Sequence, residues 1–247
     1  MTEKWPVPDT ADVEANLSRV RERIAAACAR YGRKEEDVTL LAVTKTVSAE
    51  RINRAVSCGV TKIGENRVQE YLQKQPLLLP VEAHLIGHLQ TNKVGQIVGK
   101  VAMIQSVDSL HLAAAIQKAA EKIGVRVDIL AEVNVGGEES KSGVSPEEAE
   151  EFCNELSAFP ALNLRGLMTV PPISDSEVKK RQYFSRMSQL FIDIQGKIRH
   201  NNTMNILSMG MSDDYVEAIA EGSTMVRIGS AIFGKRDYSH SVSVPKL

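Results

Sequence analysis

Lys45 is the residue of this chain best placed for covalent chemistry. It directly follows the apolar, partly β-branched run 38–44, which is bounded by polar segments, as is typical of a buried strand. A lysine at the end of such a strand presents its amine at the rim of the sheet, where partial desolvation makes it a candidate for Schiff-base formation. Most lysines at the ends of strands are simply solvated, so the position of Lys45 alone does not establish this chemistry.

Polar side chains gather at the ends of two further predicted strands. The segment 65–67 (Glu-Asn-Arg) closes the strand predicted at 61–65, and the polar segment 88–93 follows the strand at 83–87. In a barrel of parallel strands, the reactive groups lie at the carboxyl ends of the strands and in the loops that follow. These segments therefore predict a site at one end of the sheet.

Two glycine- and serine-containing segments near the end of the chain, 208–214 and 222–230, have the composition of an anion site. Small residues let backbone N–H groups approach an anion, and the N-terminus of the short helix predicted there adds a favourable dipole. Barrels often bind phosphate at this place. Ser212 alone is more typical of a helix N-cap and Gly229 of a turn, but the two segments together predict phosphate binding.

Arg227 lies in the predicted last strand, on the face opposite Val226 and Ile228. If that face points into a barrel, the guanidinium is buried and needs an acceptor. An aromatic ring nitrogen would serve, and so would a carboxylate in an internal salt bridge; the residues alone leave both open.

Metal and serine-hydrolase sites have no support in the sequence. His84 and His88 are four residues apart, but Leu85 and Gly87 place them in a strand context rather than in the zinc-binding helix, which has glutamate after its first histidine. No Gly-x-Ser-x-Gly motif occurs. We therefore expect no metal ligands.

The elements that must position these residues alternate between short strands and helical periods along the whole chain. Eight strands within about 200 residues, without a Pro- or Gly-rich linker, favour a closed (β/α)8 TIM barrel of the α/β class over an open doubly wound sheet. The strands are predicted at 38–44, 61–65, 83–87, 102–107, 127–134, 163–169, 204–209 and 224–229.

The helices should pack outside the sheet. Capping boxes at 145–148 and 174–177 each predict the start of a helix. Apolar residues at helical spacing before the first strand predict an extra helix that covers the side or bottom of the barrel and ends at Gly32. We expect residues 1–247 to form one domain, with 1–35 as the N-terminal extension and covering helix.

Composition excludes several classes of protein. The formal charge of −1 argues against a general binder of nucleic acid or of membrane surfaces, because such proteins need a basic excess. No run of 18 apolar residues and no secretory leader pattern occurs, so we expect a cytoplasmic protein. The three cysteines have no metal-type spacing and are expected to be reduced. Because the covering helix completes the core, a monomer is expected.

Five long motifs, in order, resemble the signature segments of the pyridoxal phosphate homeostasis proteins. The resemblance runs from the first predicted strand to nearly the end of the chain. The motifs are 41–45 (LAVTK), 64–70 (GENRVQE), 84–93 (HLIGHLQTNK), 207–214 (LSMGMSDD) and 222–229 (GSTMVRIG).

This resemblance implies a barrel like the N-terminal domain of alanine racemase, with pyridoxal 5′-phosphate held as a Schiff base on Lys45. It places Asn66 near the ring, Arg227 against the pyridine nitrogen, and Ser208 and the turn 229–230 on the phosphate. Ser230 stands where many relatives have threonine, and either hydroxyl can donate to phosphate. The full set of expected cofactor-binding residues is Lys45, Asn66, Ser208, Met209, Ser212, Arg227, Gly229 and Ser230.

The family implies buffering or delivery of the cofactor, with apo-enzymes that need it as recipients and with no catalytic residues. An arginine at the ring nitrogen cannot easily give up a proton, so the ring stays a weak electron sink. Racemisation needs a second base, which alanine racemase takes from an additional β-domain; we expect that domain to be missing, because the chain ends at Leu247. An amino-acid racemase, and an enzyme whose lysine attacks a phosphorylated carbonyl substrate, are the alternatives.

Overall fold

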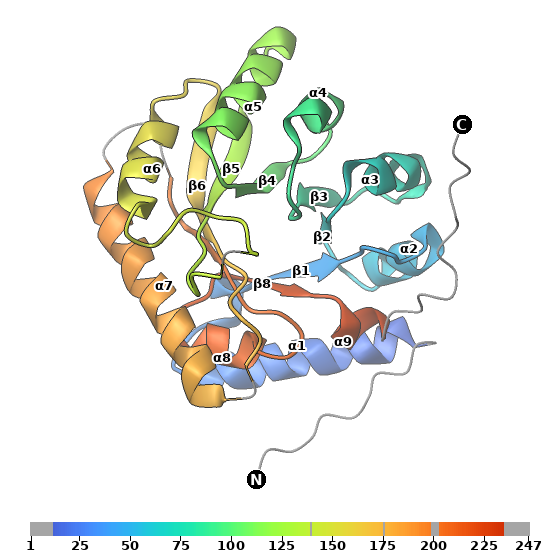
Figure 1. The fold of residues 1–247 in the computed structure, drawn as a ribbon. Helices are drawn as coiled ribbons and strands as arrows, with labels where there is room; N and C mark the ends of the chain where they lie inside the picture. Colours follow the sequence, from blue (N-terminus) through green and yellow to red (C-terminus); the bar gives the residue numbers. More distant parts are fainter. Residues whose placement is uncertain (1–11, 139, 175, 199–202, 235–247) are drawn as a thin grey trace.

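Eight parallel strands close into a barrel with helices around its outside (Figure 1). The computed structural model describes residues 12–138, 140–174, 176–198 and 203–234. Each strand pairs with the next along the chain, and the first pairs with the last, which confirms the predicted barrel. The strands are β1 (Thr39–Val43), β2 (Lys62–Glu65), β3 (Glu82–Leu85), β4 (Met103–Val107), β5 (Val127–Glu132), β6 (Leu162–Met168), β7 (Ile206–Ser208) and β8 (Met225–Ile228).

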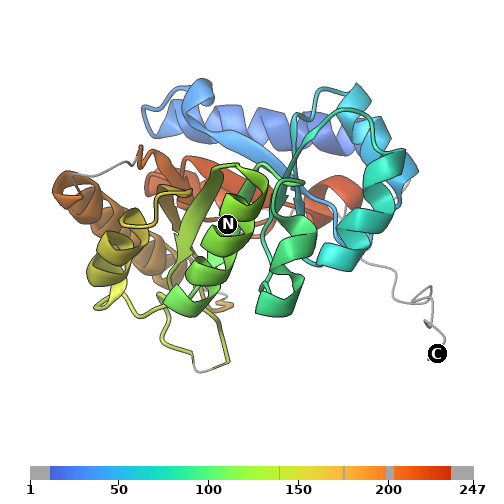
Figure 2. The ribbon, with the colours of Figure 1, turned by 90° about the horizontal axis from the view of Figure 1, so that it is seen from above.

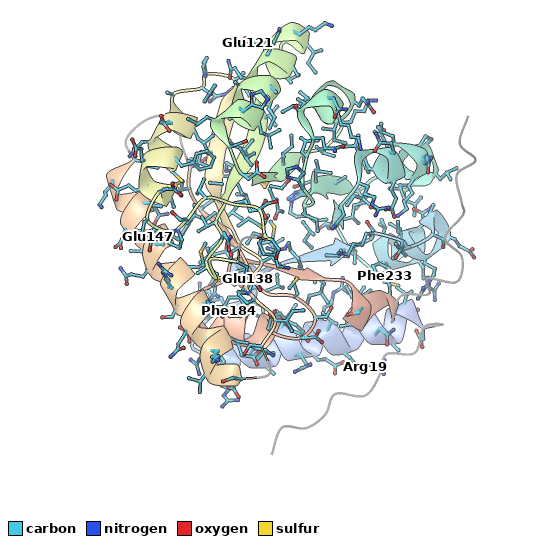
Figure 3. The ribbon with its side chains drawn as sticks, viewed as in Figure 1. Arg19, Glu121, Glu138, Glu147, Phe184 and Phe233 are labelled. Carbon is cyan, nitrogen blue, oxygen red and sulfur yellow. The ribbon has the colours of Figure 1, made fainter. Side chains whose placement is uncertain are left out.

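One helix precedes β1, one follows β8 and the others connect consecutive strands, and their apolar faces pack toward the barrel. Phe184, fully buried on the helix that follows β6, is one of the core side chains (Figure 3). The helices are α1 (Val13–Arg30), α2 (Ala49–Ser57), α3 (Val68–Lys74), α4 (Val94–Ile97), α5 (Leu110–Ile123), α6 (Ala149–Ser157), α7 (Glu177–Lys197), α8 (Tyr215–Ala220) and α9 (Ser230–Phe233).

The predicted extra helix is α1, which covers the side of the barrel rather than its bottom. It packs along α2, α8 and α9, where the last strand meets the first (Figure 2). Asp12 caps its start by accepting from the Ala15 N–H at 2.8 Å, and Asn16 fastens it to α9 by donating to the Ile232 carbonyl at 2.9 Å. The helix ends just before Gly32, as predicted. Residues 1–11 and 235–247 of the predicted single domain lie outside the described residues.

The two predicted capping boxes have different outcomes. Ser145 and Glu148 exchange the expected hydrogen bonds, at 3.1 Å and 3.3 Å, but the chain makes one more turn before α6 begins at Ala149. The prediction of Ser174 as the cap of α7 is wrong, because Ser176 directly precedes the helix and its hydroxyl accepts from the third helical N–H. Ser174 accepts from the Ser176 N–H instead.

No described helix is long and apolar enough to cross a bilayer. All three cysteines, Cys28, Cys58 and Cys153, are free thiols. The described residues include no group of three or more His, Cys, Asp or Glu side chains arranged to hold a metal ion.

Candidate functional site

The closure of the barrel brings three of the predicted site residues to neighbouring strands. In the register of the sheet, Ala42 of β1 lies opposite Ile228 of β8, and Val43 lies opposite Gly64 of β2. Lys45, two residues beyond β1, therefore emerges between Asn66, which directly follows β2, and Gly229, which directly follows β8. All three lie at the carboxyl end of the barrel, where active sites of this fold are found.

Asn66 has an unsatisfied polar group at this end. Its side-chain oxygen Oδ1 is buried and has no hydrogen-bond partner in the structure. The backbone around it is tightly packed, since a Cβ added at Gly87 would lie 2.4 Å from the Asn66 carbonyl oxygen. Buried polar groups are normally paired with protein, water or ligand, so this oxygen makes Asn66 a candidate ligand contact.

The two loops predicted to form an anion site do meet. The Ser212 hydroxyl accepts from the backbone N–H groups of Gly229 and Ala231, at 3.2 Å and 3.3 Å, and so lies at the start of α9. A Cβ at Gly229 would lie 3.2 Å from Val43 Cβ, which places this turn against the end of β1. Ser230, at the start of α9, is exposed to solvent. The turn therefore places small residues and the hydroxyl-bearing side chains of Ser212 and Ser230 beside the end of β1, the strand that leads to Lys45.

Arg227 is buried inside the barrel, as its position in the strand predicted. Its guanidinium donates from Nη1 to the Ser208 hydroxyl and from Nη2 to the Thr169 carbonyl, both at 2.7 Å. Burial lowers the pKa of Arg227 to about 10, and the carboxylates of Asp214 and Glu132 oppose this shift. The guanidinium therefore stays charged at neutral pH.

A chain of buried hydrogen bonds runs from Arg227 through the barrel. The Ser208 hydroxyl donates to Gln105 Oε1 at 2.7 Å, the Gln105 amide nitrogen contacts His84 Nδ1 at 2.8 Å, and His84 Nε2 contacts Glu82 Oε1 at 2.8 Å. Because arginine can only donate, each bond along this chain is directed the same way, and His84 donates from Nε2 to Glu82. We call these five residues the polar relay.

The polar relay defines the surroundings of Ser208 and separates it from the predicted anion turn. The hydroxyl proton of Ser208 is donated to Gln105 inside the barrel, so its expected phosphate contact stays a prediction. Met209, the next residue, is fully buried; its N–H donates to the Met225 carbonyl at 3.1 Å and its own carbonyl accepts from Ser223 at 2.7 Å. Neither side chain shares a hydrogen bond with Ser212 or Gly229 among the described residues.

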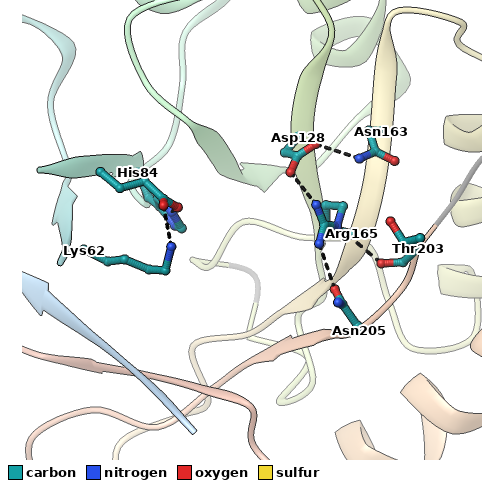
Figure 4. Close-up of polar contacts among 8 residues, drawn as sticks. Lys62, His84, Asp128, Asn163, Arg165, Thr203 and Asn205 are labelled. Carbon is teal, nitrogen blue, oxygen red and sulfur yellow. Dashed lines mark hydrogen bonds and ion pairs between the residues drawn. The ribbon is translucent and has the colours of Figure 1, made fainter. Parts of the chain in front are cut away.

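The amino end of the barrel holds a cavity of about 820 Å³ that none of the predicted site residues lines. Two pairs of its charged side chains bind one another, as Figure 4 shows. Lys62 binds Glu82 at 2.5 Å, and Arg165 binds Asp128 at 2.7 Å and Asn205 at 3.2 Å. None of the residues predicted to bind the cofactor lies at this amino end of the barrel.

Glu132 is a site residue that the sequence analysis missed. It is the last residue of β5, its side-chain Oε2 is buried, and that oxygen has no hydrogen-bond partner in the structure. Burial, together with the nearby charge of Asp108, raises the pKa of Glu132 to about 7, against the opposing effect of the Arg227 guanidinium. The signal in the sequence was a carboxylate at the end of β5, directly after the apolar run 129–131.

Replacing Glu132 by glutamine should change how stability depends on pH. The folded state holds a proton on Glu132 that the unfolded state releases above pH 4.5. The contribution of this group to the free energy of unfolding is therefore fully present below pH 4.5 and is lost as pH rises through about 7. Glu132→Gln cannot ionise and keeps the shape, so it should exceed the parent in unfolding free energy by about 1–3 kcal/mol at pH 8 and by little at pH 4.5. Urea unfolding at both pH values measures this.

Glu147→Gln is the matched control. It makes the same chemical change at an exposed glutamate, two residues before α6 begins. The difference in unfolding free energy between Glu147→Gln and the parent should be the same at the two pH values. A Glu132→Gln difference that is the same at pH 4.5 and pH 8 would show that the Glu132 carboxyl is not held protonated by the fold.

Comparison with known proteins identifies the family. Residues 13–237 match the model of the alanine racemase N-terminal domain. A pyridoxal phosphate homeostasis protein of Aquifex aeolicus is 47% identical over 90% of this chain and 97% of its own length. The protein of the same name from Escherichia coli K12 is 39% identical over 92% of this chain and 98% of its own length.

Solved structures agree with this assignment. A protein of unknown function from Bifidobacterium adolescentis superposes with a TM-score of 0.87 at 38% identity, over 91% of this chain and 95% of its own. PipY of Synechococcus elongatus, solved with PLP bound, gives 0.78 at 29% identity, over 90% and 100%. Alanine racemase of Clostridium difficile, at 17% identity and 0.73, shares the fold over 92% of this chain and 57% of its own. The chain belongs to the alanine racemase N-terminal domain family and, within it, to the pyridoxal phosphate homeostasis proteins.

Proposed function

We propose that this protein binds pyridoxal 5′-phosphate as a Schiff base on Lys45 and serves in the homeostasis of that cofactor. The observation that carries the proposal is the register of β8, β1 and β2, which brings the Gly229 turn, Lys45 and Asn66 together at one end of the barrel. The orphaned Asn66 oxygen and the small, hydroxyl-bearing residues of the turn fit a phosphorylated aromatic aldehyde. The relatives' names and the PLP bound to PipY support the same ligand.

The residues have distinct roles in this proposal. The Lys45 amine binds the aldehyde carbon, and the turn formed by Ser212, Gly229 and Ser230 receives the phosphate. Arg227 faces the ring nitrogen, and Asn66 contacts the ring substituents. Ser208 makes a further contact with the phosphate, and Met209 is the residue next to it on the cofactor's side of the chain. When bound, the cofactor supplies a carbonyl that captures amines and a ring that can accept electrons.

The same arrangement supports a carrier rather than an enzyme. Arg227 is charged at neutral pH and can only donate, so it keeps the ring nitrogen unprotonated and the ring a weak electron sink. We propose that the protein acts in the cytoplasm as a monomer and passes the cofactor to apo-enzymes that require it. The curated relatives are named homeostasis proteins, which supports this reading.

No observation favours the racemase alternative. The likeness to alanine racemase, at 17% identity, concerns the fold alone. The tyrosines that could supply a second base, Tyr71, Tyr183 and Tyr215, lie on helices rather than at strand ends, and Tyr71 donates its hydroxyl to the Lys100 carbonyl at 2.8 Å. The third alternative is direct attack of Lys45 on a phosphorylated carbonyl substrate. The mass that borohydride fixes to the lysine distinguishes it from cofactor binding, because the substrate and the cofactor add different masses.

Lys45→Ala should abolish the near-ultraviolet or visible absorbance that the parent gains with pyridoxal phosphate, because the bond to the amine is lost. Folding should be unaffected, since a side chain at a strand end contributes little packing. Borohydride treatment of the loaded parent, followed by mass spectrometry, should place one reduced cofactor on Lys45. Lys93→Ala, which removes a lysine that does not end a strand, is the control and should keep the absorbance. Labelling of Lys93 or Lys141 instead would refute the assignment.

Gly229→Asp should weaken the binding of pyridoxal phosphate by at least about tenfold, because it sets a negative charge against the phosphate. Gly229→Ala is the matched control: it adds the same Cβ beside Val43 without the charge. Affinity is measured by absorbance titration of each variant, and pyridoxal without its phosphate is titrated alongside. Equal affinity of the Asp and Ala variants for pyridoxal phosphate would place the phosphate elsewhere.

A further inference from the structure

The turn that carries Lys45 has a strained backbone. Thr46, the next residue, has φ +62°, and it is the one non-glycine residue with a positive φ in the part of the chain that the structure describes. In this left-handed region the Cβ crowds the carbonyl oxygen, so a β-branched residue is disfavoured there by roughly five- to thirtyfold. Such a conformation persists when neighbouring groups hold it, and it is found most often at functional sites.

Two side chains from α3 bind the backbone on both sides of Lys45. The carboxylate of Glu70 accepts from the N–H of Thr46, the residue after Lys45. The ammonium of Lys74 donates to the carbonyl of Thr44, the residue before Lys45, at 2.8 Å. The two side chains are also joined to each other, because Lys74 Nζ lies 2.6 Å from Glu70 Oε1.

A third contact anchors this pair to the barrel. Lys74 Nζ also binds Oε1 of Glu65, the last residue of β2, at 2.9 Å, and the Thr44 hydroxyl donates to the same oxygen at 2.6 Å. The three donors of the Lys74 ammonium are therefore all used. The side chains of Lys74 and Glu65 are only 14% and 1% exposed, so their attraction is screened less than that of a surface pair.

We propose that Glu70 and Lys74 are positioning residues that hold the strained turn at Thr46 in the one conformation that directs the Lys45 amine to the cofactor's aldehyde. Neither residue is required to touch the cofactor. The inference rests on the proposed role of Lys45, and it adds a reason for the strain. Glu70 and Lys74, which together we call the brace, hold a backbone conformation that threonine would otherwise leave.

The experiment compares Glu70→Ala with Glu70→Gln, which keeps an acceptor oxygen for the Thr46 N–H. Pyridoxal phosphate is titrated into each purified variant, and the absorbance of the Schiff base gives the apparent dissociation constant. Melting temperature is measured on the same samples. Glu150→Ala is the control, because it breaks an exposed ion pair with Lys197.

We expect Glu70→Ala to bind about tenfold more weakly than the parent, Glu70→Gln to recover most of that loss, and Glu150→Ala to match the parent. The decisive variant is Thr46→Gly, since glycine adopts a positive φ without strain. In the Thr46→Gly background, Glu70→Ala should weaken binding by no more than about twofold. If Glu70→Ala alone does not fold, the Thr46→Gly background and Glu70→Gln still supply the comparison.

Two results would overturn the inference: parent-like binding by Glu70→Ala, or an equal loss with threonine and with glycine at position 46. If the loss of affinity in each variant instead follows the drop in its melting temperature, Glu70 acts through general stability, and the inference is overturned as well. Lys45→Ala is included in the series. If the parent's absorbance persists in Lys45→Ala, the proposed function fails; if it disappears there but Glu70→Ala binds normally, only the brace fails.

Discussion

The buried guanidinium of Arg227 sets the polarity of the barrel interior. An arginine cannot be neutralised at ordinary pH, so a buried one must be supplied with acceptors by the surrounding strands. Arg227 obtains them from Thr169 after β6 and from Ser208 in β7. The Ser208 hydroxyl accepts from Arg227 and donates its own proton to Gln105, which brings Gln105, His84 and Glu82 into one directed chain.

This constraint links the two ends of the barrel. Its amino end has the carboxylate of Glu82, whose pKa is lowered to about 2, first by its hydrogen bond from His84 and then by Lys62. Its carboxyl end has the fixed positive charge of Arg227. Loss of one member of the polar relay would leave a buried partner unsatisfied, at a cost of about 1–3 kcal/mol. The interior is thus preorganised around one cation before any ligand arrives.

The sequence predicted the parts of the site that follow from topology. Once eight strands close into a barrel, Lys45, Asn66 and Gly229 must emerge side by side, because each lies within two residues of the end of its strand. The burial of Arg227 followed in the same way from its place in the alternation of β8. These predictions needed only the order of the strands and the two-residue period of a strand.

The rest depended on contacts that no local pattern reveals. Gln105 and Ser208 are 103 residues apart, so their hydrogen bond could not be read from spacing. Thr46 gave no sign of a positive φ, because glycine is the residue that normally marks one. Ser174 and Ser176 are both reasonable caps, and only the course of the backbone decides between them.

The ¹⁵N chemical shift of the ring nitrogen, measured on pyridoxal phosphate labelled at that atom and bound to the protein, tests the central claim most directly. If Arg227 stays charged and donates to the ring, the shift will be that of an unprotonated pyridine that accepts a hydrogen bond, and it will not change between pH 6 and pH 8. A pyridinium shift at pH 7 would contradict the account, because it would mean that the buried guanidinium does not control the ring.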